Sequence, residues 1–165
     1  MKRRIFLAAA GVATLAGCGF QLRQAPAFAF DSIYIQAPPT SPIAHELRRN
    51  LASGNSVRVL NNATEQANAR VILEVPLELR EKVVVGLNST GQVREFQLRS
   101  RIRFKLRTPD GRELIPETEL LQQRDISFNE GAVLAKEAEE TLLYRDMQTD
   151  LVQQLMRRLA ALKGV

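Results

Sequence analysis

The chain has 165 residues, of which 45% are hydrophobic and 25% are charged, and its formal net charge is +5. This length and composition predict one globular domain with a sizeable core and exclude wholesale disorder. One cysteine and one histidine are too few for a zinc cluster or a disulfide framework.

The N-terminus has the pattern of an export signal. Three basic residues at 2–4 precede an apolar run at 5–16, which is shorter than the roughly 20 residues that a membrane-spanning helix needs. Leu15-Ala16-Gly17-Cys18 resembles a bacterial lipobox, whose cysteine is acylated and becomes the first mature residue. The alternative is an ordinary signal with an accidental cysteine. We predict a lipoprotein signal peptide at 1–17, a lipidated tether at 18–30 and a single α/β domain at 31–163.

An acylated Cys18 would fix the chain to a membrane. Each buried acyl CH₂ contributes ~0.8 kcal/mol, so two or three chains anchor stably where one does not. Gly19 stands where inner-membrane lipoproteins tend to carry Asp, so the predicted location is the periplasmic side of the outer membrane. Acylation also consumes the thiol, which leaves no Cys–His catalytic pair.

A strand, a helix and a second strand are predicted at the start of the domain. Ile33 to Ile35 has β-branched and aromatic residues typical of a strand. Ser41 is the expected N-cap of a helix with proline in its first turn, and Gly54 is its expected stop. A second short strand at 57–60 then predicts a parallel crossover.

Two long alternating segments follow, at 70–80 and 93–107, and the turn at 88–91 joins them into an antiparallel hairpin. Pairing Asn88 with Gly91 predicts a register in which apolar residues meet and acids meet bases. The expected pairs are Val83 with Phe96, Leu77 with Ile102, Glu74 with Lys105, and Glu78 with Arg101. A bulge is expected at 81–82, where the alternation breaks, and Pro76 favours an edge or a bulge.

A third long strand is expected within 114–128 and a long amphipathic helix at 132–162. The whole is an α/β fold of the α+β sandwich kind. It has a mixed sheet of about four to five strands, with two helices packed on one face.

One face of the second hairpin strand carries a cationic ladder, which we define as Arg99, Arg101, Arg103, Lys105 and Arg107. One interpretation is a solvated outer face, offset by Glu74 and Glu78. The other is a surface for an anionic partner, either a phosphorylated lipid or an acidic protein wall. Nucleic acid is not an expected partner of an exported lipoprotein.

Nothing in the sequence predicts catalysis, a cofactor or a metal site. His45 is expected on a helix surface. The loop at 86–91 has the glycine spacing of a phosphate-binding loop but lacks the lysine and hydroxyl residue that should follow. We expect a protein that is not an enzyme.

Four stretches, taken in order, resemble the lipopolysaccharide-assembly lipoprotein LptE family. They are Cys18-Gly19-Phe20-Gln21-Leu22-Arg23, the hairpin exit at 90–98, Leu134-Ala135-Lys136-Glu137, and the final helix around Leu155-Met156-Arg157-Arg158-Leu159. The resemblance implies two helices on a β-sheet. It also implies a plug inside the LptD-type outer-membrane β-barrel, held by its lipid in the inner leaflet, with which it inserts lipopolysaccharide into the outer leaflet.

The resemblance further implies direct lipopolysaccharide binding by basic residues. Lys136 matches one family position, with an ordinary solvated helix residue as the alternative. The family's arginine at the hairpin tip falls at Ser89, and Arg94 is the expected substitute. The candidate lipopolysaccharide-binding residues are therefore Lys136, Arg94, Arg99, Arg101 and Arg103. A different class remains open, a peripheral outer-membrane lipoprotein that scaffolds another envelope or secretion assembly.

Overall fold

The computed structural model describes residues 26–54 and 56–164. Cys18, the predicted signal peptide and most of the predicted tether lie outside these residues. The strands are β1 (Ser32–Gln36), β2 (Arg58–Leu60), β3 (Val71–Leu87), β4 (Val93–Arg107) and β5 (Glu113–Ser127). The helices are α2 (Pro42–Ser53) and α3 (Val133–Ala160), with short 3₁₀ turns η1 (Ala63–Asn68) and η2 (Glu130–Ala132).

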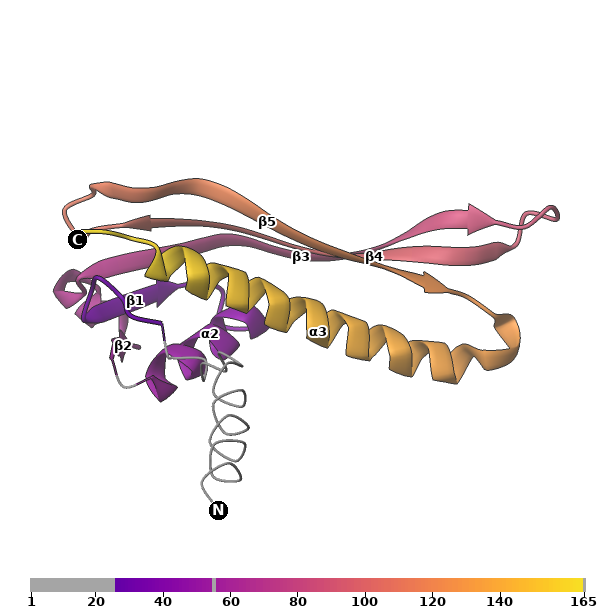
Figure 1. The fold of residues 1–165 in the computed structure, drawn as a ribbon, viewed down its shortest axis with the longest axis horizontal. Helices are drawn as coiled ribbons and strands as arrows, with labels where there is room; N and C mark the ends of the chain where they lie inside the picture. The colour runs from indigo at the N-terminus through magenta and orange to yellow at the C-terminus, as the bar shows by residue number, and fades with distance from the viewer. Residues whose placement is uncertain (1–25, 55, 165) are drawn as a thin grey trace, which may run out of the picture.

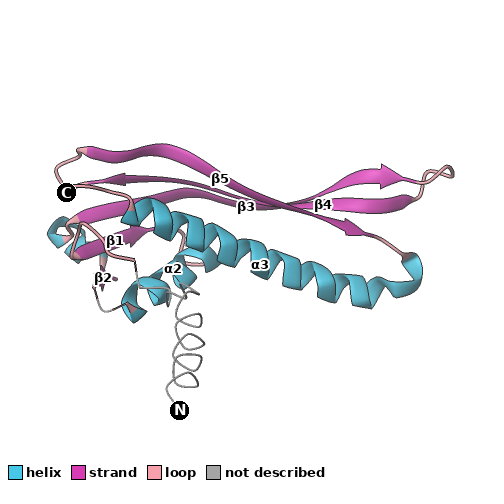
Figure 2. Cartoon of the chain, viewed as in Figure 1, coloured by secondary structure: helices cyan, strands magenta, loops and turns pink. Residues whose placement is uncertain are grey.

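The strands form one mixed sheet in the order β2-β1-β3-β4-β5. β1 pairs in parallel with both β2 and β3, while β3, β4 and β5 form an antiparallel meander. Both α2 and α3 lie on the same side of the sheet (Figures 1 and 2). The predicted fold class, a mixed sheet with helices on one face, is therefore confirmed.

The molecule is elongated along the long strands (Figure 1). We call the end that holds α2, β1 and β2 the proximal end. We call the end that holds the β3–β4 turn and the start of α3 the distal end. This shape follows from strand length, because β3 and β4 continue well beyond β1 and β2.

The main core lies between the proximal half of the sheet and both helices. Strand residues Ile33, Leu73 and Phe104 pack in this core with Leu47 of α2 and Leu155 of α3. Each of these five residues is 0% exposed. Each fully buried side chain of this size contributes roughly 1.5–3 kcal/mol. The predicted apolar faces of both helices are the faces that pack here.

The distal half has a thinner apolar layer. Leu98, Ile126 and Met147 form its buried cluster. Polar contacts supplement it: the Arg80 guanidinium donates to Gln148 at 2.8 Å, and the Tyr144 hydroxyl donates to the Glu81 carbonyl at 2.8 Å. α3 is thus held by apolar packing proximally and by a mixture of contacts distally.

Helix α2 begins and ends where its sequence predicts. The Ser41 hydroxyl accepts a hydrogen bond from the Ala44 amide at 3.0 Å, and Pro42 opens the helix. Gly54 is its C-cap. Phe28 and Phe30, at the end of the predicted tether, pack on the core beside this helix.

The predicted hairpin register is wrong over most of its length. Glu74 does face Lys105, but Leu77 faces Arg103, Glu78 faces Ile102 and Val83 faces Gln97. The register shifts between Glu74 and Leu77, around Pro76, because proline has no N–H for the ladder. The bulge expected at 81–82 is absent from these described strands, and further shifts occur at Gly86 instead.

The bulge at Pro76 exchanges the two faces of β3. Before it, Val71, Leu73 and Val75 are buried under the helices. Beyond it, Arg80 contacts α3, whereas Leu79 pairs with Arg101 on the uncovered face and is 40% exposed. Beyond the bulge, Arg80 and Lys82 therefore face the helices, and Leu79 and Glu81 lie on the uncovered face.

Candidate functional site

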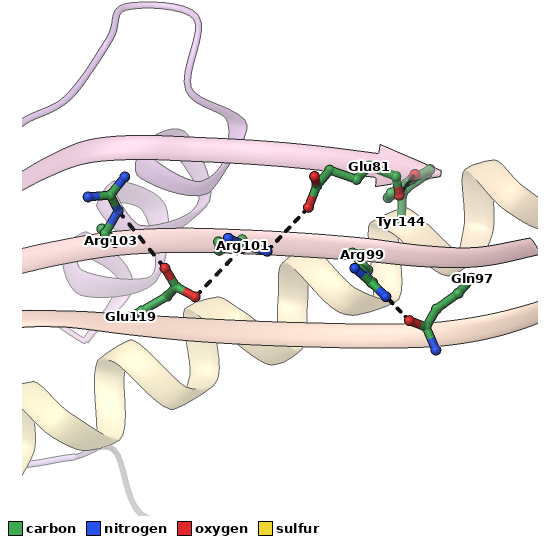
Figure 3. Close-up of polar contacts among 7 residues, drawn as sticks. All are labelled: Glu81, Gln97, Arg99, Arg101, Arg103, Glu119 and Tyr144. Carbon is green, nitrogen blue, oxygen red and sulfur yellow. Dashed lines mark hydrogen bonds and ion pairs between the residues drawn. The ribbon is translucent and has the colours of Figure 1, made fainter. Parts of the chain in front are cut away.

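The cationic ladder lies on the sheet face that the helices leave uncovered. Leu98, Ser100, Ile102 and Phe104 of β4 are all 0% exposed beneath the helices. Because side chains alternate along a strand, the ladder residues between them point to the other side. Figure 3 shows Arg99, Arg101 and Arg103 in a row along this strand.

Glutamates on the neighbouring strands neutralise the middle of the ladder. Arg101 lies 3.4 Å from Glu81 of β3 and 3.6 Å from Glu119 of β5, and so bridges three strands (Figure 3). Arg103 lies 3.3 Å from Glu117 and 3.9 Å from Glu119. None of these carboxylates is a predicted partner. The bulge moves Glu81, rather than Glu78, onto this face, and Glu117 and Glu119 come from the pairing of β4 with β5.

Glu74 neutralises the proximal end of the ladder. Its carboxylate lies 2.9 Å from Lys105 Nζ and 2.6 Å from Arg107 Nε. Burial by itself raises the pKa of Glu74, but the hydrogen bonds and charges of Arg107 and Lys105 outweigh burial and hold the pKa below its ordinary value. The carboxylate is therefore ionised at neutral pH.

Arg99 differs from its neighbours. Its Nε donates to the Gln97 side chain at 2.8 Å, and it makes no ion pair with any residue in the described ranges (Figure 3). Arg99 is thus the ladder cation whose charge is least neutralised by neighbouring carboxylates. The rest of the ladder forms a cross-strand network within this chain.

Lys136 lies in the first turns of α3 at the distal end. Its ammonium group donates to the Ser127 hydroxyl at 2.9 Å and pairs with Glu139 at 2.9 Å. It lines a small cavity of about 60 Å³ between the sheet and α3, together with Phe96, Phe128 and Lys82. A cation beside aromatic side chains suits an amphipathic ligand.

Lys82 is a second cation at this cavity, and sequence reasoning missed it. Its ammonium group lies 4.4 Å from the centre of the Phe96 ring and 2.6 Å from Glu140 of α3. It reaches the helix side because the Pro76 bulge exchanges the faces of β3. The signal in the sequence is the broken alternation at 81–82, which by itself predicts a local bulge rather than an exchange of faces.

Arg94 also lies at the distal end, just beyond the hairpin turn, but it does not line the Lys136 cavity. It lines a neighbouring cavity of about 200 Å³ with Gln92, Asn129 and Glu130. Within the described ranges its guanidinium has no hydrogen-bond or ion-pair partner. Lys136 and Arg94 therefore share one end of the molecule, while the ladder lies on the uncovered face.

Side-chain hydrogen bonds close the turn that precedes Arg94. The Asn88 side-chain oxygen accepts hydrogen bonds from the amides of Thr90 and Gln92, at 3.0 and 2.9 Å. Gly91 has φ of 83°, a left-handed conformation that glycine adopts without strain. Ser89, which the resemblance aligns with a basic residue of the family, is exposed in this turn.

Apolar side chains gather at the distal end without cover from this chain. Leu134, next to Lys136 in sequence, is 82% exposed, and Leu87 beside the turn is 61% exposed. Val84, Val85, Val133 and Leu142 are also exposed. Exposed apolar side chains that lie near one another are typical of surfaces that contact a partner or a lipid.

The described residues form no candidate metal-binding cluster. No group of three or more His, Cys, Asp or Glu side chains among them could hold a metal ion. His45 is exposed, as predicted, and its Nε2 lies 2.9 Å from the Pro39 carbonyl oxygen. Among the described helices, none is both long and apolar enough to cross a membrane.

The fold and these surfaces define a small domain with a mixed sheet, helices on one face and an open, charged opposite face. Residues 30–159 match the family model LptE, described as lipopolysaccharide-assembly. Because the match covers most of the chain, the protein belongs to the LptE family.

Relatives from several organisms carry the name LPS-assembly lipoprotein LptE. The protein from Pectobacterium atrosepticum is 28% identical over 99% of this chain and 89% of its own length. The protein from Photorhabdus laumondii is 31% identical over 96% of this chain and 87% of its own length. The alignments thus span nearly the whole of each protein.

Solved structures share the fold. The uncharacterized lipoprotein B from Nitrosomonas europaea superposes with a TM-score of 0.74 at 35% identity, covering 87% of this chain and 91% of that one. The rare lipoprotein B from Shewanella oneidensis has a TM-score of 0.66 at 19% identity, covering 79% and 95%. The second likeness supports the architecture alone.

Proposed function

We propose that this chain is a non-enzymatic outer-membrane lipoprotein subunit of the complex that transports and inserts lipopolysaccharide. In this proposal it plugs an LptD-type β-barrel and binds lipopolysaccharide itself. The observation that carries the proposal is the family match over residues 30–159. The names of the relatives, which refer to LPS assembly, support it.

The anchor in this proposal is a lipid on Cys18. It holds the chain in the inner leaflet of the outer membrane, on the periplasmic side, after removal of residues 1–17. The lipobox pattern and the shared lipoprotein names of the relatives support this assignment. Mass spectrometry of the mature N-terminus checks it: the expected product begins at Cys18 and carries acyl chains.

The distal end is the proposed lipopolysaccharide contact. Lipid A is a phosphorylated, acylated glycolipid, so its recognition requires cations beside apolar surface. Lys136 and Arg94 supply the cations, and the exposed Leu134 and Leu87 supply the apolar surface. A phosphate displaces Glu139 from Lys136 at small cost, because that pair is on the surface and weak.

The uncovered sheet face is the proposed contact with the barrel wall. Enclosing a bare row of five cations in a lumen would cost several kcal/mol per desolvated charge. Here Glu74, Glu81 and Glu119 already pair with ladder cations, so enclosure removes less charge from water. Arg99, Arg101 and Arg103 then make directional contacts to the wall or to passing glycolipid. Arg99 is the most available of the three, because it makes no ion pair within the described residues.

Binding to immobilised lipopolysaccharide tests the glycolipid contact. Each charge-assisted contact that is lost weakens binding about tenfold or more, so we expect the double variant Lys136→Glu/Arg94→Glu to bind at least tenfold more weakly. The control is Arg145→Glu, an exposed arginine on the same helix with no ion pair in the described ranges. Equal affinity of the double variant and the control would remove these residues from the proposed contact.

A further inference from the structure

Another cavity of the described chain lies at the proximal end, far from the proposed lipopolysaccharide contact. It is a groove of about 730 Å³ between the C-terminal ends of α2 and α3. Asn50, Ser53 and Gly54 form one wall, Met156 and Ala160 belong to the other, and Phe28 lies across it. The family resemblance and the proposed function assign no role to this groove.

One cation lines the groove, and two more lie near its lining residues in sequence. Arg157 lines it, and Arg49 precedes Ser53 by four residues on α2, so the two side chains share one helix face. Lys163 follows Ala161, the last lining residue, by two residues. All three cations are exposed, and none has a hydrogen-bond or ion-pair partner within the described ranges. Placement at a helix C-terminus accounts for Arg157, but it does not account for Arg49 on α2.

No acid offsets these cations inside the groove, since none of its lining residues is Asp or Glu. The nearest acids along the two helices are already engaged. Glu46 accepts a hydrogen bond from Gln148 at 2.6 Å, and Asp150 pairs with Arg124 at 2.8 Å. The groove is therefore a positively charged surface with an apolar floor, in contrast to the neutralised ladder.

The position of the groove in the chain points to the membrane. Pro26, the first described residue, is one of its lining residues. Cys18 precedes Pro26 by eight residues, which span at most roughly 26–29 Å when fully extended. If Cys18 is lipidated, the leaflet surface lies within that distance of the groove.

We propose that this groove binds the headgroup of an anionic phospholipid in the leaflet that holds the Cys18 anchor. The phosphate would lie between Arg49 and Arg157, and the glycerol backbone would lie against Met156 and Ala160. The inference rests on the lipid anchor of the proposed function, to which it adds a second attachment point. Two such attachments fix the orientation of the domain at the membrane, which one flexible tether does not.

Vesicle co-sedimentation tests the proposal on residues 19–165, which carry no lipid. Every buried core residue lies between Phe30 and Leu159, so this chain keeps the complete core. We expect it to bind vesicles of phosphatidylcholine mixed with phosphatidylglycerol and not vesicles of phosphatidylcholine alone. Each cation near an anionic surface contributes about fivefold in affinity, so Arg49→Gln/Arg157→Gln should bind about twenty-fivefold more weakly.

Arg145→Gln is the matched control for Arg157→Gln alone, because each removes one charge from α3 and the two residues lie about 18 Å apart along it. All of these side chains are exposed, so thermal unfolding should be unchanged in each variant. Equal losses of binding in the two single variants would overturn the groove and leave a general charge effect. Binding that ignores the phosphatidylglycerol content would also overturn it.

A short-chain phosphatidylglycerol, titrated below its micelle concentration, distinguishes a built site from surface attraction. We expect saturable NMR shifts at the amides of Ser53, Gly54, Ala160 and Ala161, and their loss in Arg49→Gln/Arg157→Gln. Shifts confined to the distal amides would overturn the proposal. Neither experiment measures lipopolysaccharide or the barrel, so its failure leaves the proposed function intact.

Discussion

The Ser41 hydroxyl donates a hydrogen bond to the Glu78 carboxylate at 2.5 Å across 37 residues of sequence. This bond joins the N-cap of α2 to β3 just beyond its bulge. Glu78 points toward the helices because Pro76 shifts the register of β3. One proline therefore sets which carboxylate meets α2 and which carboxylate meets the cationic ladder.

We predict that Ser41→Ala lowers the free energy of unfolding by about 1–2 kcal/mol, because it removes both the helix cap and the partner of Glu78. Urea denaturation followed by circular dichroism measures this. Thr149→Ala, an exposed change on α3, should stay within about 0.5 kcal/mol of the parent chain. A Ser41→Ala variant as stable as Thr149→Ala would show that the cap contributes nothing.

The main core predicts that two leucines of α3 differ in their contribution to the free energy of unfolding. Leu155 is 0% exposed and Leu134 is 82% exposed. Leu155→Ala should cost about 2–5 kcal/mol of stability, because it leaves a cavity between the helices and the sheet. Leu134→Ala should cost almost nothing. A comparable loss from both variants in denaturant titrations would contradict the orientation of α3.

Glu74 predicts a pH dependence. Its pKa lies below the ordinary value of 4.5 in the folded chain, so its contribution to stability is complete above pH 4.5 and is lost as the pH falls through the lower folded pKa. Glu74→Gln removes that contribution and leaves Lys105 and Arg107 without their carboxylate. We expect a loss of about 1 kcal/mol at neutral pH, discounted for solvent screening.

The measurement is a set of denaturant titrations of the parent chain and Glu74→Gln from neutral to acid pH. The difference between them should stay constant down to about pH 5 and shrink below pH 4.5. Glu65→Gln, an acid of η1 outside the ladder, is the control. A difference that grows on acidification would have the wrong sign for a carboxylate with a lowered pKa.

The ladder predicts unequal effects at two arginines. Arg101→Gln leaves Glu81 and Glu119 on one face without the cation between them, and should cost about 0.5–1 kcal/mol. Arg99→Gln breaks no ion pair of the described chain and should cost less than half of that. Thermal unfolding of both variants at low and high salt measures the two losses of stability. The Arg101→Gln effect should fade with salt, and a salt-independent loss would point to packing instead.

Much of the fold could be predicted because local signals agreed with one another. Ser41, Pro42 and Gly54 marked both ends of α2 correctly. Strict alternation placed Leu98, Ile102 and Phe104 on the buried face of β4, and so placed the ladder on the other. Each of these signals depends on a few neighbouring residues, which is why a single sequence was sufficient.

The register of the hairpin could not be predicted in the same way. Pairing acids with bases favoured Glu78 opposite Arg101, yet the actual partners are Glu81 and Glu119. Pro76 predicts an edge or a bulge, but a proline alone does not give the size of the register shift that follows it. The role of Glu119 needed the β4–β5 pairing, which depends on contacts between distant segments rather than on any local pattern.

Co-purification with its partners tests the central claim most directly, that this chain is the plug of an outer-membrane barrel. A C-terminal tag on the mature lipoprotein, mild detergent extraction and mass spectrometry would identify what remains bound. We predict one large β-barrel protein in a near-equal ratio that survives stringent washing. Recovery of the protein alone, or with soluble periplasmic partners that wash away, would contradict the plug and favour a peripheral scaffold.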